Sequence, residues 1–255
     1  MANSNVLLDR NTHIGQNVCG TCYEGRITLP GRNESAPSGV TISNSLFSGG
    51  NSDGIQNGSN GTRIIGNEIT GVVQNSAAHS DSIQLYGSKN TLVKGNYIHD
   101  VPTGIMSGDG TDHETIEDNV IVNTTLGGGY ASVVLGPDDG SIVRHNTFDS
   151  QIRVCSSMGA NSCNAPSRPS VGTVLKDNVI DQLWVNGTSV SFAEENYNLF
   201  GSISAPSGFT RGAQDIIGQP TFVDGANPTT YGGFRLAAGS LGKGNASDGL
   251  DRGIR

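Results

Sequence analysis

The sequence is poor in charged residues, in aromatic residues and in long apolar runs, and each shortage excludes a class of protein. Charged residues make up only 15% and aromatic residues only 5% of the chain. Because the strong helix formers Glu, Lys, Ala and Leu are sparse, we do not expect an all-helical or a doubly wound fold. No apolar run approaches the roughly 20 residues of a membrane-spanning helix, so we expect no membrane partner.

The chain nevertheless has the residues of an ordered β protein. Disordered chains are usually highly charged and poor in β-branched residues. Here short runs of Val, Ile, Leu and Thr recur throughout, separated by stretches rich in Ser, Asn and Gly, of which Gly alone numbers 37. This pattern is typical of many short strands joined by turns, and it predicts an all-β fold.

The chain also lacks a surplus of basic residues, which argues against a nucleic-acid partner. The net charge is −8, whereas binding to a phosphate backbone depends on Lys and Arg that displace counterions. Residues 1–5 have neither the basic nor the apolar part of a secretion signal. We still expect a secreted protein, with a signal that lies outside this sequence.

One phrase recurs along the chain: an aliphatic residue, then Asn three positions later, then Ile or Phe two positions after that. Its copies are Ile64–Ile69, Val93–Ile98, Ile116–Ile121, Val143–Phe148 and Leu175–Ile180, and Ile42–Phe47 carries Ser in the Asn position. The successive asparagines lie 29, 23, 27 and 32 residues apart. An irregular period in the twenties, with two or three strands per period, is typical of a parallel β-helix.

We therefore predict a right-handed parallel β-helix of about eight coils over residues 1–200, with an irregular capping segment at 201–255 in the same domain. Equivalent residues of successive coils then form columns at the ~4.8 Å strand spacing. The asparagines should form an internal ladder of amides, and the flanking aliphatic residues should fill the core. The position two before each Asn should face solvent and form a column of mostly opposite charges; it holds Ile65, Lys94, Glu117, Arg144 and Lys176.

Both ends of such a helix need protection, because an open end exposes unpaired strand edges. The segment Phe234–Gly253 resembles the one that closes many extracellular bacterial β-helix proteins, so we expect it to act as a cap. No amphipathic helix precedes Val6. We expect that end to be truncated, covered by Cys19–Ala36, or buried in a homo-oligomer.

The four cysteines form two local pairs, Cys19 with Cys22 and Cys155 with Cys163. The two pairs lie about five coils apart, roughly 24 Å at the rise of one strand spacing per coil, which is too far for a shared zinc site or a bridge between them. We predict a disulfide within each pair, which favours an extracellular location.

A second recurring phrase contains candidate catalytic residues. Asp53-Gly54-Ile55-Gln56 is followed one period later by Asp81-Ser82-Ile83-Gln84. Thr103–Met106 and Ala131–Val134 occupy the same place in the next two periods. If the copies stack, Asp53 lies beside Asp81 and Gln56 beside Gln84, with both glutamines on the outer surface of one sheet.

Two neighbouring carboxyl groups are what inverting glycoside hydrolysis requires, one as general acid and one as general base. Like charges this close tend to raise one pKa and so separate the two roles. His79 is the third candidate catalytic residue, because it comes directly before the second motif. The candidate substrate-binding residues are Asn51, Gln56 and Gln84 for hydroxyl groups, Tyr86 and Tyr130 for sugar faces, and Asp109, Asp112 and His113 for the groove or a cation.

Asn51-Ser52-Asp53-Gly54-Ile55 resembles the Asn-Thr-Asp-Gly phrase of polygalacturonases, which belong with pectate lyases to a group of right-handed parallel β-helix proteins that act on polysaccharides. On this resemblance, Asp81 falls where that family has the second of two adjacent Asp residues. Ser80 stands in place of the first, and Thr103 stands in place of the family's His. The resemblance implies a β-helix fold and a polysaccharide or oligosaccharide substrate.

Two other functions fit the same fold. A polysaccharide lyase would need a base such as Lys89, Lys94, His79 or Tyr86, and its Asp residues could hold calcium as a cofactor. A non-catalytic glycan-binding or adhesin-like module would keep the surface Gln, Tyr and Asn residues and would not depend on Asp53 or Asp81. The two Asp residues could also act only as turn caps that accept backbone N–H groups.

Overall fold

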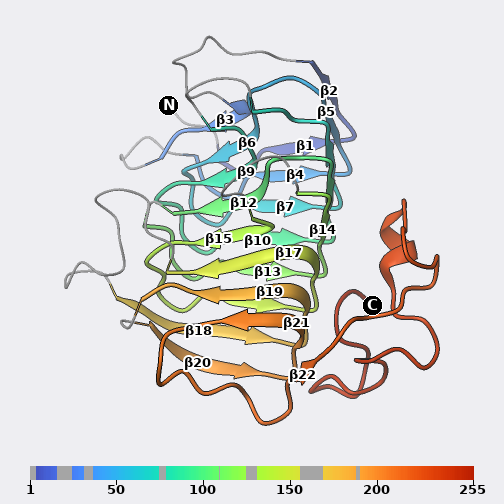
Figure 1. Ribbon diagram of the computed structural model, residues 1–255. Coiled ribbons are helices and arrows are strands. Elements are labelled where there is room, and N and C mark those ends of the chain that lie inside the picture. Colours follow the sequence, from blue (N-terminus) through green and yellow to red (C-terminus); the bar gives the residue numbers. More distant parts are fainter. Residues whose placement is uncertain are drawn as a thin grey trace.

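The computed structural model describes residues 4–15, 25–31, 37–74, 79–108, 110–124, 131–155, 169–187 and 190–255. In these residues the chain forms a parallel β-helix, in which each coil lays short strands beside the matching strands of the coil before (Figure 1). The described part contains no α-helix, only the short 3-10 helix η2 (Tyr231–Phe234). The predicted all-β solenoid is confirmed, and no described helix is long and apolar enough to span a membrane.

The described strands form an eight-stranded sheet and a 14-stranded sheet, and the pairing between neighbouring coils is parallel. We call the eight-stranded sheet face 1. Its strands are β1 (Leu7–Asp9), β4 (Thr41–Ser43), β7 (Arg63–Ile65), β10 (Leu92–Lys94), β13 (Thr115–Glu117), β16 (Ile142–Arg144), β18 (Ser170–Lys176) and β20 (Val190–Asn196).

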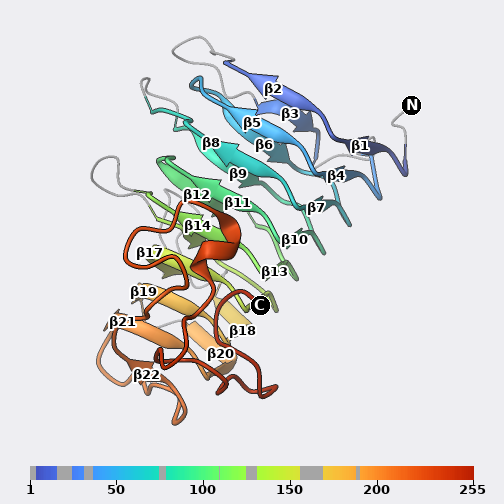
Figure 2. The ribbon, with the colours of Figure 1, turned by 90° about the vertical axis from the view of Figure 1, so that its right-hand side faces the viewer.

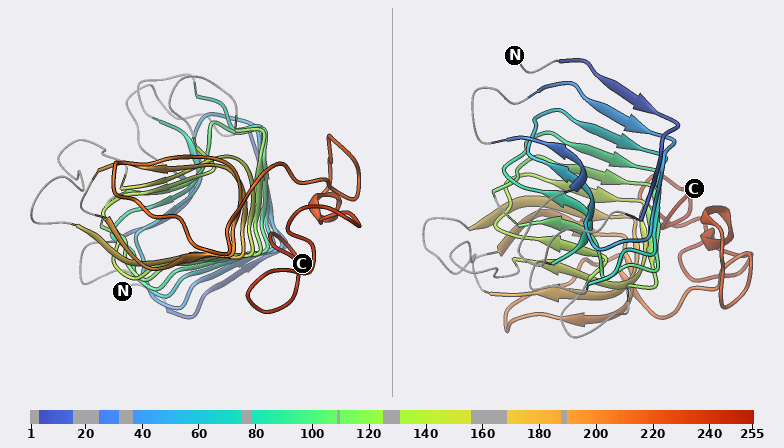
Figure 3. Two further views of the ribbon diagram at one scale, coloured as in Figure 1. Left: turned by 60° about the horizontal axis from the view of Figure 1, so that its bottom comes forward. Right: turned by 90° about the horizontal axis from the view of Figure 1, so that it is seen from above.

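The 14-stranded sheet bends around a corner and supplies two further faces, which the end-on view separates (Figure 3). Face 2 holds β2 (Thr12–Ile14), β5 (Leu46–Ser48), β8 (Glu68–Thr70), β11 (Tyr97–His99), β14 (Val120–Val122) and β22 (Ile216–Ile217). Face 3 holds β3 (Gly25–Leu29), β6 (Asp53–Asn57), β9 (Asp81–Leu85), β12 (Thr103–Ser107) and β15 (Val133–Leu135). The longer strands β17 (Thr147–Val154), β19 (Val179–Val185) and β21 (Leu199–Ser204) begin on face 2 and continue onto face 3.

The corner between face 1 and face 2 is built on the predicted asparagine ladder. From Asn67 to Asn178, each side-chain amide donates to the Oδ1 atom of the next asparagine, at 2.9–3.0 Å. The ladder extends beyond the predicted range to Asn198, whose backbone N–H donates to Asp215 Oδ1 at 2.7 Å. These asparagines are buried, so the ladder satisfies polar groups that would otherwise destabilise a tight corner.

The core consists of three aliphatic columns, one from each face. Ile64 on face 1, Ile69 on face 2 and Ile83 on face 3 are each fully buried and belong to one cluster that runs through the helix. Burying one such side chain contributes about 1.5–3 kcal/mol relative to leaving it exposed. The constant spacing of the apolar residues within the recurring phrase therefore fixes the register of faces 1 and 2 between coils.

The predicted charged column also forms. Lys94 Nζ lies 2.8 Å from Glu117 Oε1, Arg144 Nη2 lies 2.7 Å from Glu117 Oε2, and Lys176 pairs with Glu194 at 3.2 Å. Glu117 is only 6% exposed because the two cations on either side cover it. Lys94, Glu117 and Arg144 therefore alternate in charge over three coils, which stabilises their pairing. Lys176 lies opposite Arg144 in the next coil, so the alternation ends there.

The C-terminal region does two things. Residues 205–215 follow β21, and Phe209 packs edge-on against Phe192 of β20, with ring centroids 6.2 Å apart. Phe192, Ala205 and Phe209 contact the main core cluster, so this segment covers the interior at the end of the last coil.

Residues 218–255 then turn back and run along the outside of face 2 instead of over the end (Figure 2). Val120 and Val122 of β14 pack there with Phe234 and Ile254 of the tail. Arg255 Nη2 pairs with Asp118 Oδ2 at 2.9 Å. Face 2 carries apolar side chains on its outer surface that need cover, and this is why the tail lies along the side of the helix.

The cysteine predictions fall mostly outside the described residues, because Cys19, Cys22 and Cys163 all lie there. Cys155 follows β17, is 1% exposed and is disulfide-bonded. The predicted pairs Cys19–Cys22 and Cys155–Cys163 stay predictions, as does the role of Cys19–Ala36 at the N-terminal end.

Candidate functional site

The two copies of the Asp phrase stack as the sequence predicted. Strands β6 and β9 pair in parallel, with Ile55 opposite Ile83 and Gln56 opposite Gln84. Asp53 and Asp81 begin their strands, directly after the corner that joins face 2 to face 3. The chain therefore presents two carboxyl groups on neighbouring coils at one corner of the helix.

The small residue after each Asp has a structural cause. A Cβ atom added at Gly54 would lie 3.3 Å from Cγ2 of Ile69 in the core, and one at Gly104 would lie 2.5 Å from Cγ2 of Ile121. This position therefore faces the crowded interior of the corner, and the chain places Gly, Ser, Gly and Ser there in successive coils. In the phrase Asp-small-Ile-Gln, the two middle residues therefore pack in the interior, and the Asp before them and the Gln after them are polar.

Asp53, Asp81 and His79 are in direct contact. The backbone N–H of Asp81 donates to Asp53 Oδ1 at 2.8 Å. His79 Nδ1 lies 2.6 Å from Asp81 Oδ2. The Asp53 residue is 4% exposed and Asp81 is 0% exposed, whereas the His79 side chain is 32% exposed. Of these three residues, His79 is therefore the one whose side chain is in contact with solvent.

The two carboxyl groups have different electrostatic environments. Burial, followed by the neighbouring charge of Asp81, raises the pKa of Asp53 to about 7, although the Asp81 N–H and His79 act in the opposite direction. Asp81 Oδ1 is buried and has no hydrogen-bond partner among the described residues. Asp53 is therefore a protonated acid in neutral solution for a large fraction of the time, and Asp81 keeps an oxygen with unused lone pairs.

The loop before β9 holds His79 in place through Ser80. The Ser80 N–H donates to Gln74 Oε1 at 2.6 Å, and the Ser80 hydroxyl donates to the Asn51 carbonyl oxygen at 2.7 Å. Asn51 is 7% exposed and lies in the same corner, one coil earlier. Ser80 thus fixes the loop that carries His79 onto the preceding coil.

Gln56 and Gln84 form the predicted pair, with Gln56 Nε2 donating to Gln84 Oε1 at 3.2 Å. Met106 follows in the same column and groups with Ala131 and Val134 instead of with the main core, as expected for the outer side of face 3. The predicted placement on the outer side of the sheet is confirmed, but both glutamines and Met106 are each only 8% exposed.

The structure does not bring Tyr86 and His113 to the acid pair. Tyr86 follows the last residue of β9, the opposite end from Asp81, and its hydroxyl donates to the Leu29 carbonyl at 3.3 Å. His113 lies in the turn that returns to face 1, where its N–H donates to the Asp139 carbonyl at 2.9 Å. Asp112, in that same turn, pairs with Lys89 at 2.6 Å. Tyr130 and Asp109 lie outside the described residues.

Sequence reasoning missed two other features of the surface. Arg153 and Trp184 lie in the same outer column of face 3 as Gln84 and Met106, with the Arg153 guanidinium carbon 4.8 Å from the centre of the Trp184 ring. Asp149 and Asp181 follow the recurring Ile or Phe by one residue in successive coils. An alignment of the residues that follow the first phrase would have revealed Asp149 and Asp181 as a second pair of Asp residues in neighbouring coils.

A metal centre has no support in the described residues, which contain no group of three or more His, Cys, Asp or Glu placed to hold an ion. Compared with protein-family models, with curated proteins and with solved structures, the chain has no significant match. The arrangement of Asp53, Asp81 and His79 is therefore the basis for assigning a function.

Proposed function

We propose that this protein is a glycoside hydrolase that acts on a polysaccharide or oligosaccharide, with Asp53 as general acid and Asp81 as general base. The contact between Asp53 and Asp81 carries the proposal. A general acid must hold a proton at the working pH, and the raised pKa of Asp53 meets this requirement. The unused oxygen of Asp81 is the natural acceptor for a proton from the attacking water.

His79 acts as a positioning residue in this mechanism. Its ring nitrogen holds Asp81 Oδ2 at 2.6 Å, so that the other oxygen of Asp81 is left for water. Hydrolysis begins when Asp53 gives its proton to the oxygen of the glycosidic bond. The C–O bond breaks as water attacks the sugar carbon, and Asp81 takes the proton of that water. The sum is the addition of one water molecule across the bond.

A lyase is the second candidate, and the charges near the pair weigh against it. Lyase chemistry needs a cation beside the uronate carboxylate whose neighbouring carbon loses a proton. Among the described residues, the ion pairs of Asp53 and Asp81 include no Lys or Arg, only His79. Arg153 lies three coils from Gln84 in the same column, roughly 14 Å at the strand spacing.

The test is a screen of acidic and neutral polysaccharides, read for new reducing ends and for the ultraviolet absorbance of unsaturated product ends. We expect reducing ends without absorbance, and we expect Asp53→Asn and Asp81→Asn each to abolish turnover. Asp139→Asn, which removes an exposed carboxyl group in the turn that returns to face 1, is the matched control and should keep full activity.

The same screen separates the alternatives. Absorbance together with reducing ends would establish a lyase and overturn the proposal. No product from any glycan, with binding retained in Asp53→Asn, would support a glycan-binding module. For a hydrolase, the rate should also fall as the pH rises through about 7, because Asp53 then loses the proton that it must donate.

A further inference from the structure

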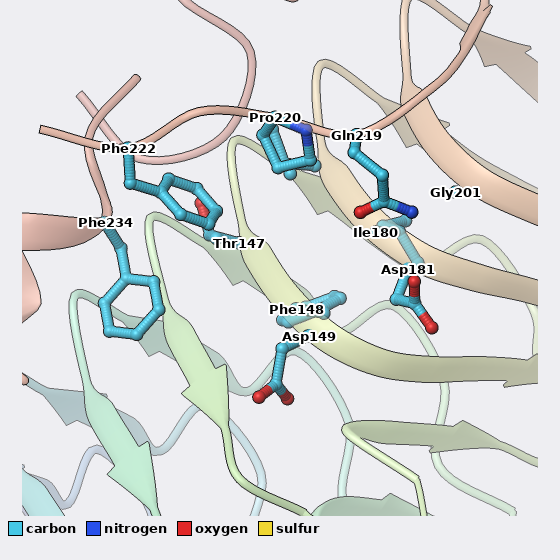
Figure 4. A pocket seen from close by; sticks show the side chains of 11 residues that line it. Thr147, Phe148, Asp149, Ile180, Asp181, Gly201, Gln219, Pro220, Phe222 and Phe234 are labelled. Atoms are coloured by element: carbon cyan, nitrogen blue, oxygen red, sulfur yellow. The ribbon is translucent and has the colours of Figure 1, made fainter. Parts of the chain in front are cut away.

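A hollow lies far from the acid pair, between the outer side of face 2 and the returning tail. It is partly open to solvent and has a volume of about 120 Å³. Figure 4 shows Phe222 and Phe234 on one side of it and Gln219 and Asp181 on the other. The hollow exists because the tail crosses β17 and β19 without filling the space above them.

The tail supplies an apolar wall. Phe222 and Phe234 meet edge-to-face, with ring centroids 5.4 Å apart and planes at 67°. Phe234 is 6% exposed and anchors the tail, whereas Phe222 is half-buried. Pro220 continues this wall toward Gln219. An aromatic and proline wall of this kind can pack against the C–H face of a ring.

The β-helix supplies the polar wall. Asp149 and Asp181 follow residues that pair in register, Phe148 with Ile180, so their carboxyl groups lie one coil apart. The Asn123 N–H donates to Asp149 Oδ2 at 2.7 Å. Although Asp149 is an exposed residue, desolvation, followed by the charges of Asp181 and Asp100, raises its pKa to about 6.

Gly201 keeps the hollow open at the next coil. A Cβ atom at this position would lie 2.7 Å from both Asp181 Oδ1 and Gln219 Nε2. A side chain here would therefore occupy the space between the carboxyl group and the amide. The absence of one leaves both polar groups lining the hollow.

We propose that this hollow binds one hexopyranose ring that carries no acid group, with Phe222 and Pro220 against its C–H face and Asp149, Asp181 and Gln219 bonded to its hydroxyls. The two opposite walls match the apolar face and polar edge of a sugar ring. Carboxylate oxygens accept hydrogen bonds from hydroxyls, whereas two acidic side chains repel a uronate. The choice of a sugar as the ligand rests on the proposed function, whereas the presence of the hollow is independent of it.

The hollow is a separate subsite from the acid pair. Asp81 begins β9, and Asp149 lies on β17, which is three coils away through β12 and β15. That separation is roughly 14 Å along the axis of the helix. Binding at the hollow can therefore be measured in a protein whose acid pair has been inactivated.

The experiment is a titration of the 15N-labelled full chain with glucose, galactose, mannose and galacturonate, followed by NMR. We expect at least one neutral sugar to shift the Gln219 side-chain amide and the Gly201 amide, with a Kd of about 1–10 mM, and galacturonate to shift neither. Asp149→Asn/Asp181→Asn and Phe222→Ala should each weaken this binding at least tenfold, and Asp139→Asn should leave it unchanged.

Two outcomes would overturn the proposal: no shift at Gln219 and Gly201 with any neutral sugar, or equal binding of galacturonate. A spectrum that remains dispersed in the Asp149→Asn/Asp181→Asn variant shows that lost binding is not lost folding. Asp53→Asn should bind the sugar as the wild type does. A protein without turnover that still binds at the hollow would remove the hydrolase proposal and leave this one standing.

Discussion

Replacing Asp53 by Asn should make the protein more stable at alkaline pH. Asp53 is 4% exposed, and burial together with the charge of Asp81 raises its pKa to about 7. Asn has nearly the same shape, cannot ionise, and has a side-chain oxygen that can still accept the Asp81 N–H. The variant therefore keeps the contact while removing the cost of a buried charge.

The sign of the effect follows from proton linkage. In the unfolded chain an Asp has a pKa of about 3.9, so between about pH 4 and pH 7 the folded protein binds more protons than the unfolded chain. The contribution of protonated Asp53 to the free energy of unfolding is fully present below about pH 4 and is lost as the pH rises to about 7. At 1.36 kcal/mol per pKa unit, the full difference is about 4 kcal/mol.

Because Asp53 is coupled to Asp81 and His79, we expect the measured difference to be about 2–4 kcal/mol. Urea unfolding of the wild type and of Asp53→Asn at about pH 5, 6, 7 and 8 would measure it. The free energy of unfolding of the variant should exceed that of the wild type at about pH 8, and the gap should narrow toward pH 5. Asp139→Asn should follow the wild type throughout.

A variant that is no more stable than the wild type at about pH 8, or a difference that does not grow with pH, would refute the assignment of a protonated buried Asp53. The same variant tests the proposed function, because it should lose turnover while it gains stability. Opposite changes in activity and stability at one residue are expected where a functional group is held in an unfavourable environment.

Three further substitutions test the fold by urea unfolding. Asn119→Ala should cost about 3 kcal/mol, because it leaves buried donors and acceptors of the ladder without partners; an unchanged midpoint would mean that the ladder adds nothing to stability. Gly104→Ala should cost about 1–3 kcal/mol, because the added Cβ would lie 2.5 Å from a core isoleucine. Phe234→Ala should cost about 3–5 kcal/mol if the tail is part of the folded unit, while Val223→Ala, at a residue 59% exposed, should stay within about 0.5 kcal/mol.

The sequence alone was enough to predict the solenoid, because its coils repeat one chemical requirement. Asn96 and Asn119 must each bond to the next coil, and Ile98 and Ile121 must each fill the same core column. Parallel in-register stacking converts such a repeat directly into contacts between neighbours. For the same reason, the pairing of Gln56 with Gln84 and the contact of Asp53 with the next coil followed from alignment.

Only the tertiary structure decided what covers the helix. The tail has no repeat, so nothing in its sequence indicates that Phe234 lies on Val120 of face 2 or that Phe209, instead of the final segment, closes the end. The sequence also did not indicate that Gln84 is only 8% exposed on the outer side of face 3. Periodicity specifies which residues of successive coils are neighbours, whereas exposure depends on irregular segments whose path is set by shape and apolar contact.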